Sequence, residues 1–316
     1  MKLASLFLVV AVAPLGACGD DGSTGADAAP IDTSTLTYAP CANDRAVGGF
    51  AVELGDGFTA VQGQVFDAVN PGKLLQTVQT EGTCSWVRAP QFVCDPACAG
   101  GMTCGTGNVC VAQPVAQDVG DVVAFGLKAA VTMPPRAPAY FYSFTGTLPH
   151  PGFDPGASLR LTTAGTTTLD LLGWGIEPLA GVPATMTVQS GQAMAVSWTA
   201  PTVSPPASDP VRVEITLNVN GHGLVGSHVD CVAPDTGSFT IPEPLVTALL
   251  ADGLSGFPTA TVRRTTTDSA DVAAGCVELD VRSQVTIDLT IPGLTSCSGN
   301  DDCTPPQTCQ ADLTCG

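Results

Sequence analysis

The sequence predicts a mostly β protein, built as an antiparallel β-sandwich flanked by two small disulfide-rich modules and interrupted by one short helix. Three observations support this fold class. Apolar and polar residues alternate along short segments throughout residues 115–292, with turns rich in Pro and Gly between them. Most of the 13 cysteines gather at two places that flank this region. One segment, residues 242–252, has helical spacing instead.

The N-terminus has the form of an export signal. A basic start at Lys2 is followed by an uncharged apolar run over residues 3–15, which is shorter than the roughly 20 residues that span a bilayer. The run ends in Leu15-Gly16-Ala17-Cys18, which resembles the lipobox of bacterial lipoproteins. The resemblance implies that residues 1–17 are a lipoprotein signal peptide and that Cys18 carries the lipid. The alternative is an ordinary signal peptide in which Cys18 is incidental.

The residues after Cys18 predict an anchored protein on a tether. Two or more acyl chains, as the lipobox resemblance implies for Cys18, make a stable membrane anchor. Gly19 stands where, by analogy with that family, an Asp would favour retention in the inner membrane, so we expect the outer membrane. Residues 18–40 are rich in small and acidic residues and predict a disordered tether that cannot bury enough apolar surface to fold.

Charge excludes one class of partner. The chain carries 29 acidic and 11 basic residues, a formal net charge of −18. Such a negative field repels nucleic acid and anionic membrane surfaces. We therefore expect no nucleic-acid partner, and membrane association only through the lipid.

Residues 41–113 predict a small module of β-strands and cysteines. Its first half has a hairpin signal, in which Phe50, Val52 and Leu54 alternate before a turn at residues 55–57. A third strand is expected at residues 65–69. The second half is too rich in Gly and Cys to form an apolar core, so disulfides must stabilise it.

Residues 295–316 predict a second Cys-rich module of this kind at the C-terminus. Four cysteines follow one another at six-residue intervals, and the same interval separates three cysteines of the first module. This spacing resembles the short Cys-rich repeats of secreted and lipid-anchored proteins of myxobacterial type. The cysteines concerned are Cys297, Cys303, Cys309 and Cys315, and Cys98, Cys104 and Cys110.

Between the modules, residues 114–294 predict the antiparallel β-sandwich, with a division into two sub-units near residue 181 left open. The clearest strand runs from Val211 to Val219, with alternate residues apolar. The helix over residues 242–252 begins with prolines and ends before Gly253. Further strands are expected around the alternating residues Phe125, Leu127, Ala129, Val131 and Met133; Leu159 and Leu161; Leu169 and Leu171; Met194, Val196 and Trp198; and Val285, Ile287, Leu289 and Ile291.

One part of this region resembles the early strands of fibronectin type III and related immunoglobulin-like domains. Residues 194–201 read Met-Ala-Val-Ser-Trp-Thr-Ala-Pro and precede the strand from Val211. The resemblance implies that Trp198 packs in the core of an immunoglobulin-like sandwich, with residues 182–188 as the preceding strand. The later strands lack the tyrosine of such domains, which leaves the subtype undecided.

Cysteine parity suggests a disulfide framework. Assigning Cys18 to lipid leaves an even number of cysteines, and each region then also holds an even number. We therefore expect three sets that pair among themselves: Cys231 with Cys276; the set Cys41, Cys84, Cys94, Cys98, Cys104 and Cys110; and the set Cys297, Cys303, Cys309 and Cys315. Zinc binding by the clusters is the weaker alternative because neither contains a CxxC pair or a nearby His.

The sequence offers no catalytic motif. We find no HExxH, no Gly-x-Ser-x-Gly and no phosphate-binding Gly loop. The histidines are His150, in a loop, and His222 and His228, in a strand–turn–strand segment. A zinc or hydrolytic site at His228 and Asp230 is the alternative to two solvated histidines. We assign no catalytic residue, no metal ligand and no cofactor.

We therefore expect a lipid-anchored envelope or cell-surface protein that acts in adhesion, ligand binding or envelope structure. Its expected partner is a protein or glycan, because loops on a rigid sandwich are where recognition usually takes place. The alternatives are a secreted-side hydrolase and a protease inhibitor formed by the Cys-rich modules.

Overall fold

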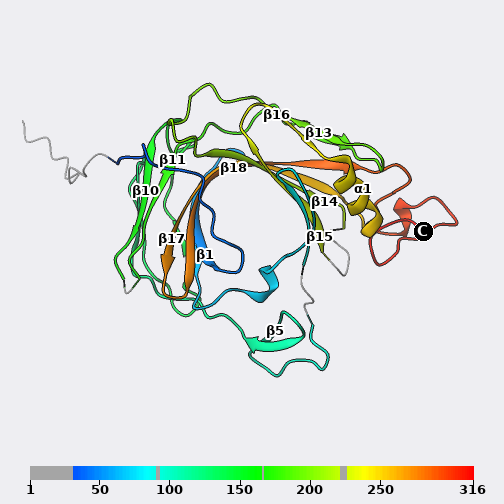
Figure 1. Cartoon of the computed structure of the whole chain (residues 1–316), viewed down its shortest axis with the longest axis horizontal. Helices are drawn as coiled ribbons and strands as arrows, with labels where there is room; N and C mark the ends of the chain where they lie inside the picture. The colour runs from blue at the N-terminus through cyan, green and yellow to red at the C-terminus, as the bar shows by residue number, and fades with distance from the viewer. Residues whose placement is uncertain (1–30, 90–92, 166, 221–225) are drawn as a thin grey trace, which may run out of the picture. The chain divides into compact units, whose positions relative to one another are not determined.

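A curved ten-stranded sheet is the largest element of the computed structural model, which describes residues 31–89, 93–165, 167–220 and 226–316 (Figure 1). All neighbouring strands are antiparallel except β1 with β18 and β12 with β18. From edge to edge the order is β3 (Gln76–Glu81), β4 (Cys84–Arg88), β15 (Ser227–Pro234), β14 (Val211–Asn218), β17 (Thr259–Val272), β18 (Gly275–Thr290), β1 (Ala46–Leu54), β2 (Thr59–Val65) and β9 (Tyr142–Ser143), with β12 (Thr185–Thr187) on β18.

Smaller elements cover the outer face of this sheet (Figure 1). One is a four-stranded sheet, and another is a strand pair next to the helix α1 (Glu243–Asp252). No helix among the described residues is long and apolar enough to span a membrane. The four-stranded sheet has the order β11 (Asp170–Trp174), β10 (Ser158–Thr163), β7 (Val122–Phe125) and β8 (Val131–Met133), and the pair is β13 (Met194–Ser197) with β16 (Ser238–Ile241).

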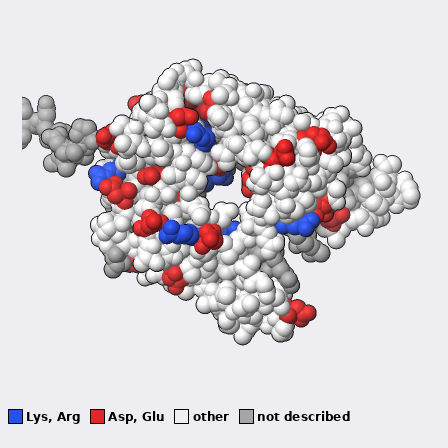
Figure 2. Space-filling model, viewed as in Figure 1, with Lys and Arg blue, Asp and Glu red and all other residues white. Residues whose placement is uncertain are grey.

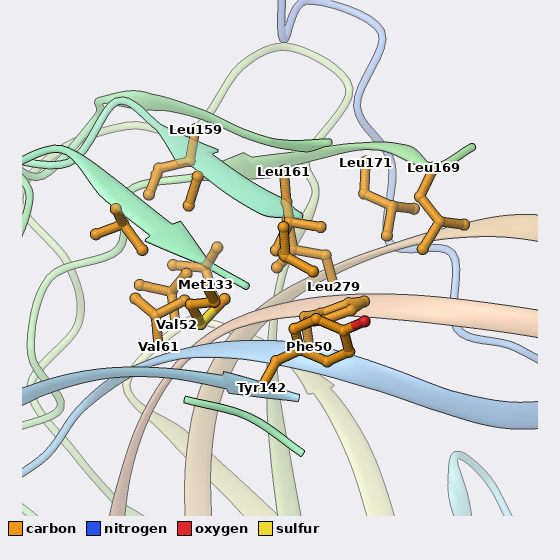
Figure 3. Packing of buried hydrophobic residues seen from close by; sticks show 14 of the residues in the cluster. Phe50, Val52, Val61, Met133, Tyr142, Leu159, Leu161, Leu169, Leu171 and Leu279 are labelled. Carbon is orange, nitrogen blue, oxygen red and sulfur yellow. The ribbon is translucent and has the colours of Figure 1, made fainter. Parts of the chain in front are cut away.

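Two apolar cores lie between the large sheet and its outer layer, so the fold is a mostly β sandwich as predicted. The first core joins β1, β2 and the start of β18 to the four-stranded sheet, as Figure 3 shows for Phe50, Leu161 and Leu279. The second joins β14, β15 and the end of β18 to β13, β16 and α1. Because β14 and β18 contribute to both cores, residues 114–294 do not separate into two sandwiches.

Local patterns predicted several elements correctly. The strand from Val211, the helix and the β1–β2 hairpin all form where alternation and turn residues placed them. Two strand predictions were wrong. Residues 122–133 form a hairpin, β7 and β8, instead of one strand. Residues 65–69 form no third strand, because β2 ends at Val65 and only Phe66 bridges to Ala116.

The predicted boundary between residues 41–113 and 114–294 was also wrong. β1 pairs with β18 over eight residue pairs, and β4 pairs with β15, so both hairpins of residues 46–88 belong to the large sheet. The physical reason is that the apolar face of β1 has too few partners in its own module and is buried against β10 and β11 instead. Among the described strands of residues 41–113, only the β5–β6 pair (Met102–Gly105 and Val109–Ala112) stays apart from the large sheet.

Residues 32–40 are ordered, although they were predicted to belong to the tether. Residues 1–30, including the predicted signal peptide and Cys18, lie outside the described residues. From residue 32, however, the chain packs on the body: Leu36 is buried, and the Tyr38 hydroxyl donates to Glu214 Oε1 at 2.9 Å. Ala39 N donates to Thr267 O at 2.9 Å. Residues 32–40 were mispredicted because the buried side chains of Thr33 and Leu36, rather than mean composition, decide their order.

The disulfides correct the predicted pairing of Cys231 with Cys276. Cys231 is bonded to Cys84, its direct partner between β15 and β4, and Cys276 is bonded to Cys41. The reason lies in the faces of the strands. Cys231 points into the second core, whereas Cys276 lies on the same face of β18 as Glu278, away from the core. The rule that each region closes its own disulfides fails for Cys41 and Cys84.

The two Cys-rich modules share one disulfide connectivity. In both, the first cysteine pairs with the third and the second with the fourth. The bonds are Cys94–Cys104 and Cys98–Cys110 in the first module, and Cys297–Cys309 and Cys303–Cys315 in the C-terminal module. The internal repeat seen in the cysteine spacing is therefore also a repeat of covalent structure.

Candidate functional site

The concave face of the large sheet is polar and hollowed. Alternate residues of its strands point away from the two cores, and on β18 these are Glu278, Asp280, Arg282 and Gln284. Figure 2 shows a hollow in the middle of the view, with acidic and basic side chains around it. A cleft of about 690 Å³ lies on this face, over β1, β2 and β18.

Strand register gives the cleft the form of a trough. Gly49 of β1 lies between Glu278 of β18 and Gln64 of β2. Two residues further, Ala51 lies between Asp280 and Gln62 in the same way. Because the middle strand carries the smallest side chains and its neighbours carry long polar ones, β1 forms a floor between two polar walls. All six of these residues line the cleft.

The segment before β1, which ends at Cys41, lies against one end of the concave face. Cys41 N donates to Glu278 Oε1 at 2.6 Å, and the disulfide Cys41–Cys276 fixes the segment beside it. Burial raises the pKa of Glu278 to about 7, although the Cys41 hydrogen bond lowers it, and the charge of Asp280 raises it further. Glu278 is therefore a carboxyl group that takes up a proton near neutral pH.

The rim of the cleft comes from two loops. Gln64 Nε2 donates to Ala139 O at 2.6 Å, which holds the loop before β9 against the cleft. That loop presents Phe141, whose side chain is 46% exposed. On the other side, the short 3-10 helix η1 (Pro71–Lys73) brings Lys73 to the cleft, and Asn70 caps it by accepting from Gly72 N at 2.9 Å.

A second, smaller hollow of about 270 Å³ continues the polar face over β14 and β17. Arg263 pairs with Glu214 at 3.2 Å there, and burial raises the pKa of Glu214. Burial, together with the charge of Glu214, raises the pKa of Tyr38. Glu214 is thus already paired with Arg263 and hydrogen-bonded by Tyr38 on this part of the concave face.

The two histidines that the structure describes, His150 and His228, do not assemble a nucleophile with a base. His228 Nε2 lies 3.0 Å from Asp230 Oδ2 on β15, but the nearby Thr216 hydroxyl donates to Asp230 Oδ1 at 2.6 Å instead of to the imidazole. His228 lies outside the lining of both hollows. His150 Nδ1 is 3.3 Å from Thr59 Oγ1 in a loop contact. His222 lies outside the described residues.

Cysteine sulfur atoms cluster closely in both modules, as a metal site would need. The sulfurs of Cys94, Cys98 and Cys110 lie within 4.8 Å of one another, as do those of Cys297, Cys303 and Cys315. Every one of these cysteines takes part in a disulfide. Every sulfur atom of these two clusters is therefore part of a disulfide, so no thiolate in them is available to bind zinc.

The cleft residues were missed by the sequence analysis because it followed the apolar face of each strand. The same alternation marks the other face: Gly49 and Ala51 are the small residues between Phe50, Val52 and Leu54. Small residues that alternate with an apolar face can therefore indicate a strand that forms the floor of a cleft. The hairpin predicts β2 as one wall, but β18 as the other wall could not be predicted, because it comes more than 220 residues later.

Comparison with known proteins adds little to this description. The sequence matches no protein-family model and no curated protein. Among solved structures, the crystal structure of the FN1–FN3 domains of chicken CNTN1 is similar over 71% of this chain and 69% of that chain, at 7% sequence identity and a TM-score of 0.20. The β-sandwich class follows from the strand pairing described above.

Proposed function

We propose that this chain is an exported protein, anchored to the outer membrane through lipid on Cys18, that binds a ligand in the concave cleft. The cleft carries the proposal. Its volume of about 690 Å³ lies in the range of roughly 300–1,000 Å³ that holds small ligands in proteins. Polar side chains from β2, β18 and η1 converge on it, whereas the apolar side chains of the large sheet are buried in the two cores.

The disulfides support the export part of the proposal. Six disulfides use every cysteine of the described residues, and such bonds persist in oxidising compartments. Cys18 is then the one cysteine of the sequence left over. An odd cysteine placed directly after an apolar N-terminal run agrees with lipidation at that position.

A hydrolase is the second candidate, and one observation favours it. Glu278, with a pKa of about 7, lies two residues from Asp280, and a raised carboxyl pKa is what a general acid needs. Binding is the better supported function because both carboxyl groups already have partners. Glu278 accepts from Cys41 N, and Asp280 Oδ1 accepts from the Thr267 hydroxyl at 2.7 Å.

Blocking the trough tests the binding function. Ala51→Leu places a larger side chain on the floor, where Ala51 is 7% exposed, and circular dichroism checks that this variant keeps the fold. Ala195→Leu, on an exposed position of β13, controls for the added side chain alone. Both variants and the wild-type chain are used to capture material from envelope extracts. We expect the wild type and Ala195→Leu to retain the same material and Ala51→Leu to lose it. Equal capture by all three would contradict a ligand site in the cleft.

A further inference from the structure

We infer that the ligand of the cleft is an uncharged glycan chain that lies along β1 between the walls of β18 and β2. This inference rests on the proposed binding function and adds the chemical class of the ligand. The trough that Gly49 and Ala51 form follows the direction of the strand, so it fits an elongated molecule. The β1 residues that line the cleft run from Ala46 to Ala51, roughly 16 Å at about 3.3 Å per residue.

The walls suit a ligand covered in hydroxyl groups. A hydroxyl both donates and accepts, so it can bond to amides and carboxylates alike. Gln62 offers both functions and Lys73 donates. Glu278 and Asp280 can each accept through their second carboxylate oxygen, because the bonds from Cys41 and Thr267 use only Oε1 and Oδ1. These groups lie on opposite sides of a narrow floor, where one sugar ring could bond to both walls at once.

Charge argues against an ionic ligand. Glu278 and Asp280 repel an anion, as does the net charge of −18 of the whole chain. Lys73 and Arg282 repel a cation, and Arg282 is itself held by Glu53 at 2.8 Å. A cleft that mixes both signs in this way is complementary to an uncharged polar molecule rather than to a polyanion or a polycation.

Backbone pairing argues against a peptide. An extended peptide brings one N–H and one C=O group per residue, and it usually satisfies them by joining a free sheet edge. The floor of this trough has no free edge, because β1 is paired with β18 on one side and with β2 on the other. A peptide would therefore have to leave most of its backbone groups to a few side chains.

Phe141 gives the site an apolar surface for a ring. Its side chain is 46% exposed at the rim, and the bond from Gln64 to Ala139 O holds its loop in place. Aromatic side chains at recognition sites supply large rigid contact area at low entropic cost. The less polar face of a sugar ring can pack on Phe141 while its hydroxyls bond to the walls.

Calorimetry on the full lipidated chain in detergent tests the inference, with neutral hexasaccharides of glucose, mannose, xylose and N-acetylglucosamine as probes. Hexagalacturonate, hexalysine and an uncharged Ser/Gly hexapeptide are the comparison ligands. We expect at least one neutral glycan to bind. Gln62→Ala and Phe141→Ala should each weaken it roughly three- to tenfold, since each removes one uncharged contact. Ala51→Leu should abolish it.

Matched controls separate local effects from general ones. Gln79→Ala removes an amide from β3, and Phe58→Ala removes a ring that is 50% exposed in the β1–β2 turn, and neither residue lines the cleft. Both should bind within twofold of wild type. Binding of a charged or peptide probe that Ala51→Leu abolishes would overturn the inference.

The glycan inference and the proposed function fail in different ways. If no neutral glycan binds, yet envelope material is still captured in a manner that Ala51→Leu abolishes, the cleft is a binding site for another class of ligand. If neither the probes nor envelope material depend on Ala51, both fail. Cleavage of a glycan probe that is lost in Glu278→Gln would support the ligand class and replace binding by hydrolysis as the function.

Discussion

A buried ion pair between the two cores allows the sharpest test of how this fold is held together. Arg264 of β17 is 1% exposed, and it pairs with Asp235 through two nitrogen atoms. Its remaining donors bond to the carbonyl oxygens of Glu177, Pro178 and Thr199. The pair therefore fixes the segment that passes from the first core to the second against the large sheet.

Asp235→Asn should destabilise the protein strongly. The amide keeps the shape and can still accept from Trp198 Nε1, which lies 2.7 Å from Asp235 Oδ1. It leaves the Arg264 charge buried without a counterion, however. Removing one partner of a buried pair typically lowers the free energy of unfolding by about 3–5 kcal/mol. At about 2 °C per kcal/mol for a chain of this size, the unfolding midpoint should fall by roughly 6–10 °C.

A double-mutant cycle identifies the cause. Arg264→Met alone leaves the Asp235 charge buried without a counterion, whereas Arg264→Met combined with Asp235→Asn removes both charges. The double variant still leaves three carbonyl groups without donors, at about 1–3 kcal/mol each. It should therefore lose less stability than the sum of the two single variants. Urea unfolding followed by circular dichroism measures all four proteins. Additive effects of the two substitutions, or a loss below about 1 kcal/mol for Asp235→Asn, would refute this reasoning.

Three further predictions concern covalent bonds, pH and the anchor. Replacing Cys41 and Cys276 together by Ala opens a loop with a sequence separation of 235, for which chain entropy gives roughly 5 kcal/mol of lost stability, measurable by urea unfolding. The folded-state pKa of Glu278, about 7, exceeds its unfolded value of 4.5, so its contribution to stability is full below pH 4.5 and is lost as the pH rises through 7. Glu278→Gln should therefore raise the midpoint relative to wild type at pH 8 but not at pH 4, and an equal effect at both would exclude this titration. Cys18→Ser should move the protein from the detergent phase to the aqueous phase on phase partitioning, and unchanged partitioning would reject lipidation.

Local patterns predicted most strands and the helix of this fold, but not which strands far apart in the sequence pair with each other. The alternation at Val211–Asn218 and the turn residues after Leu54 needed only neighbouring residues, so strand and hairpin form as expected. Cys231 and Cys276 depend on strand order across the chain, which no local pattern contains. A warning was present in the sequence: Cys276 is out of phase with Val277 and Leu279, and it does lie on the opposite face, where Cys41 reaches it.

Strand β18 shows why the cleft can be altered without unfolding the protein. Its odd-numbered residues fill the cores, whereas its even-numbered residues face the concave side. Leu279→Ala should lower the free energy of unfolding by about 2–5 kcal/mol, because Leu279 is 1% exposed in the first core. Gln284→Ala, five residues later on the exposed face, should change it by no more than about 0.5 kcal/mol. Equal losses in urea unfolding would mean that the concave face is packed rather than open at the second hollow, which Gln284 lines.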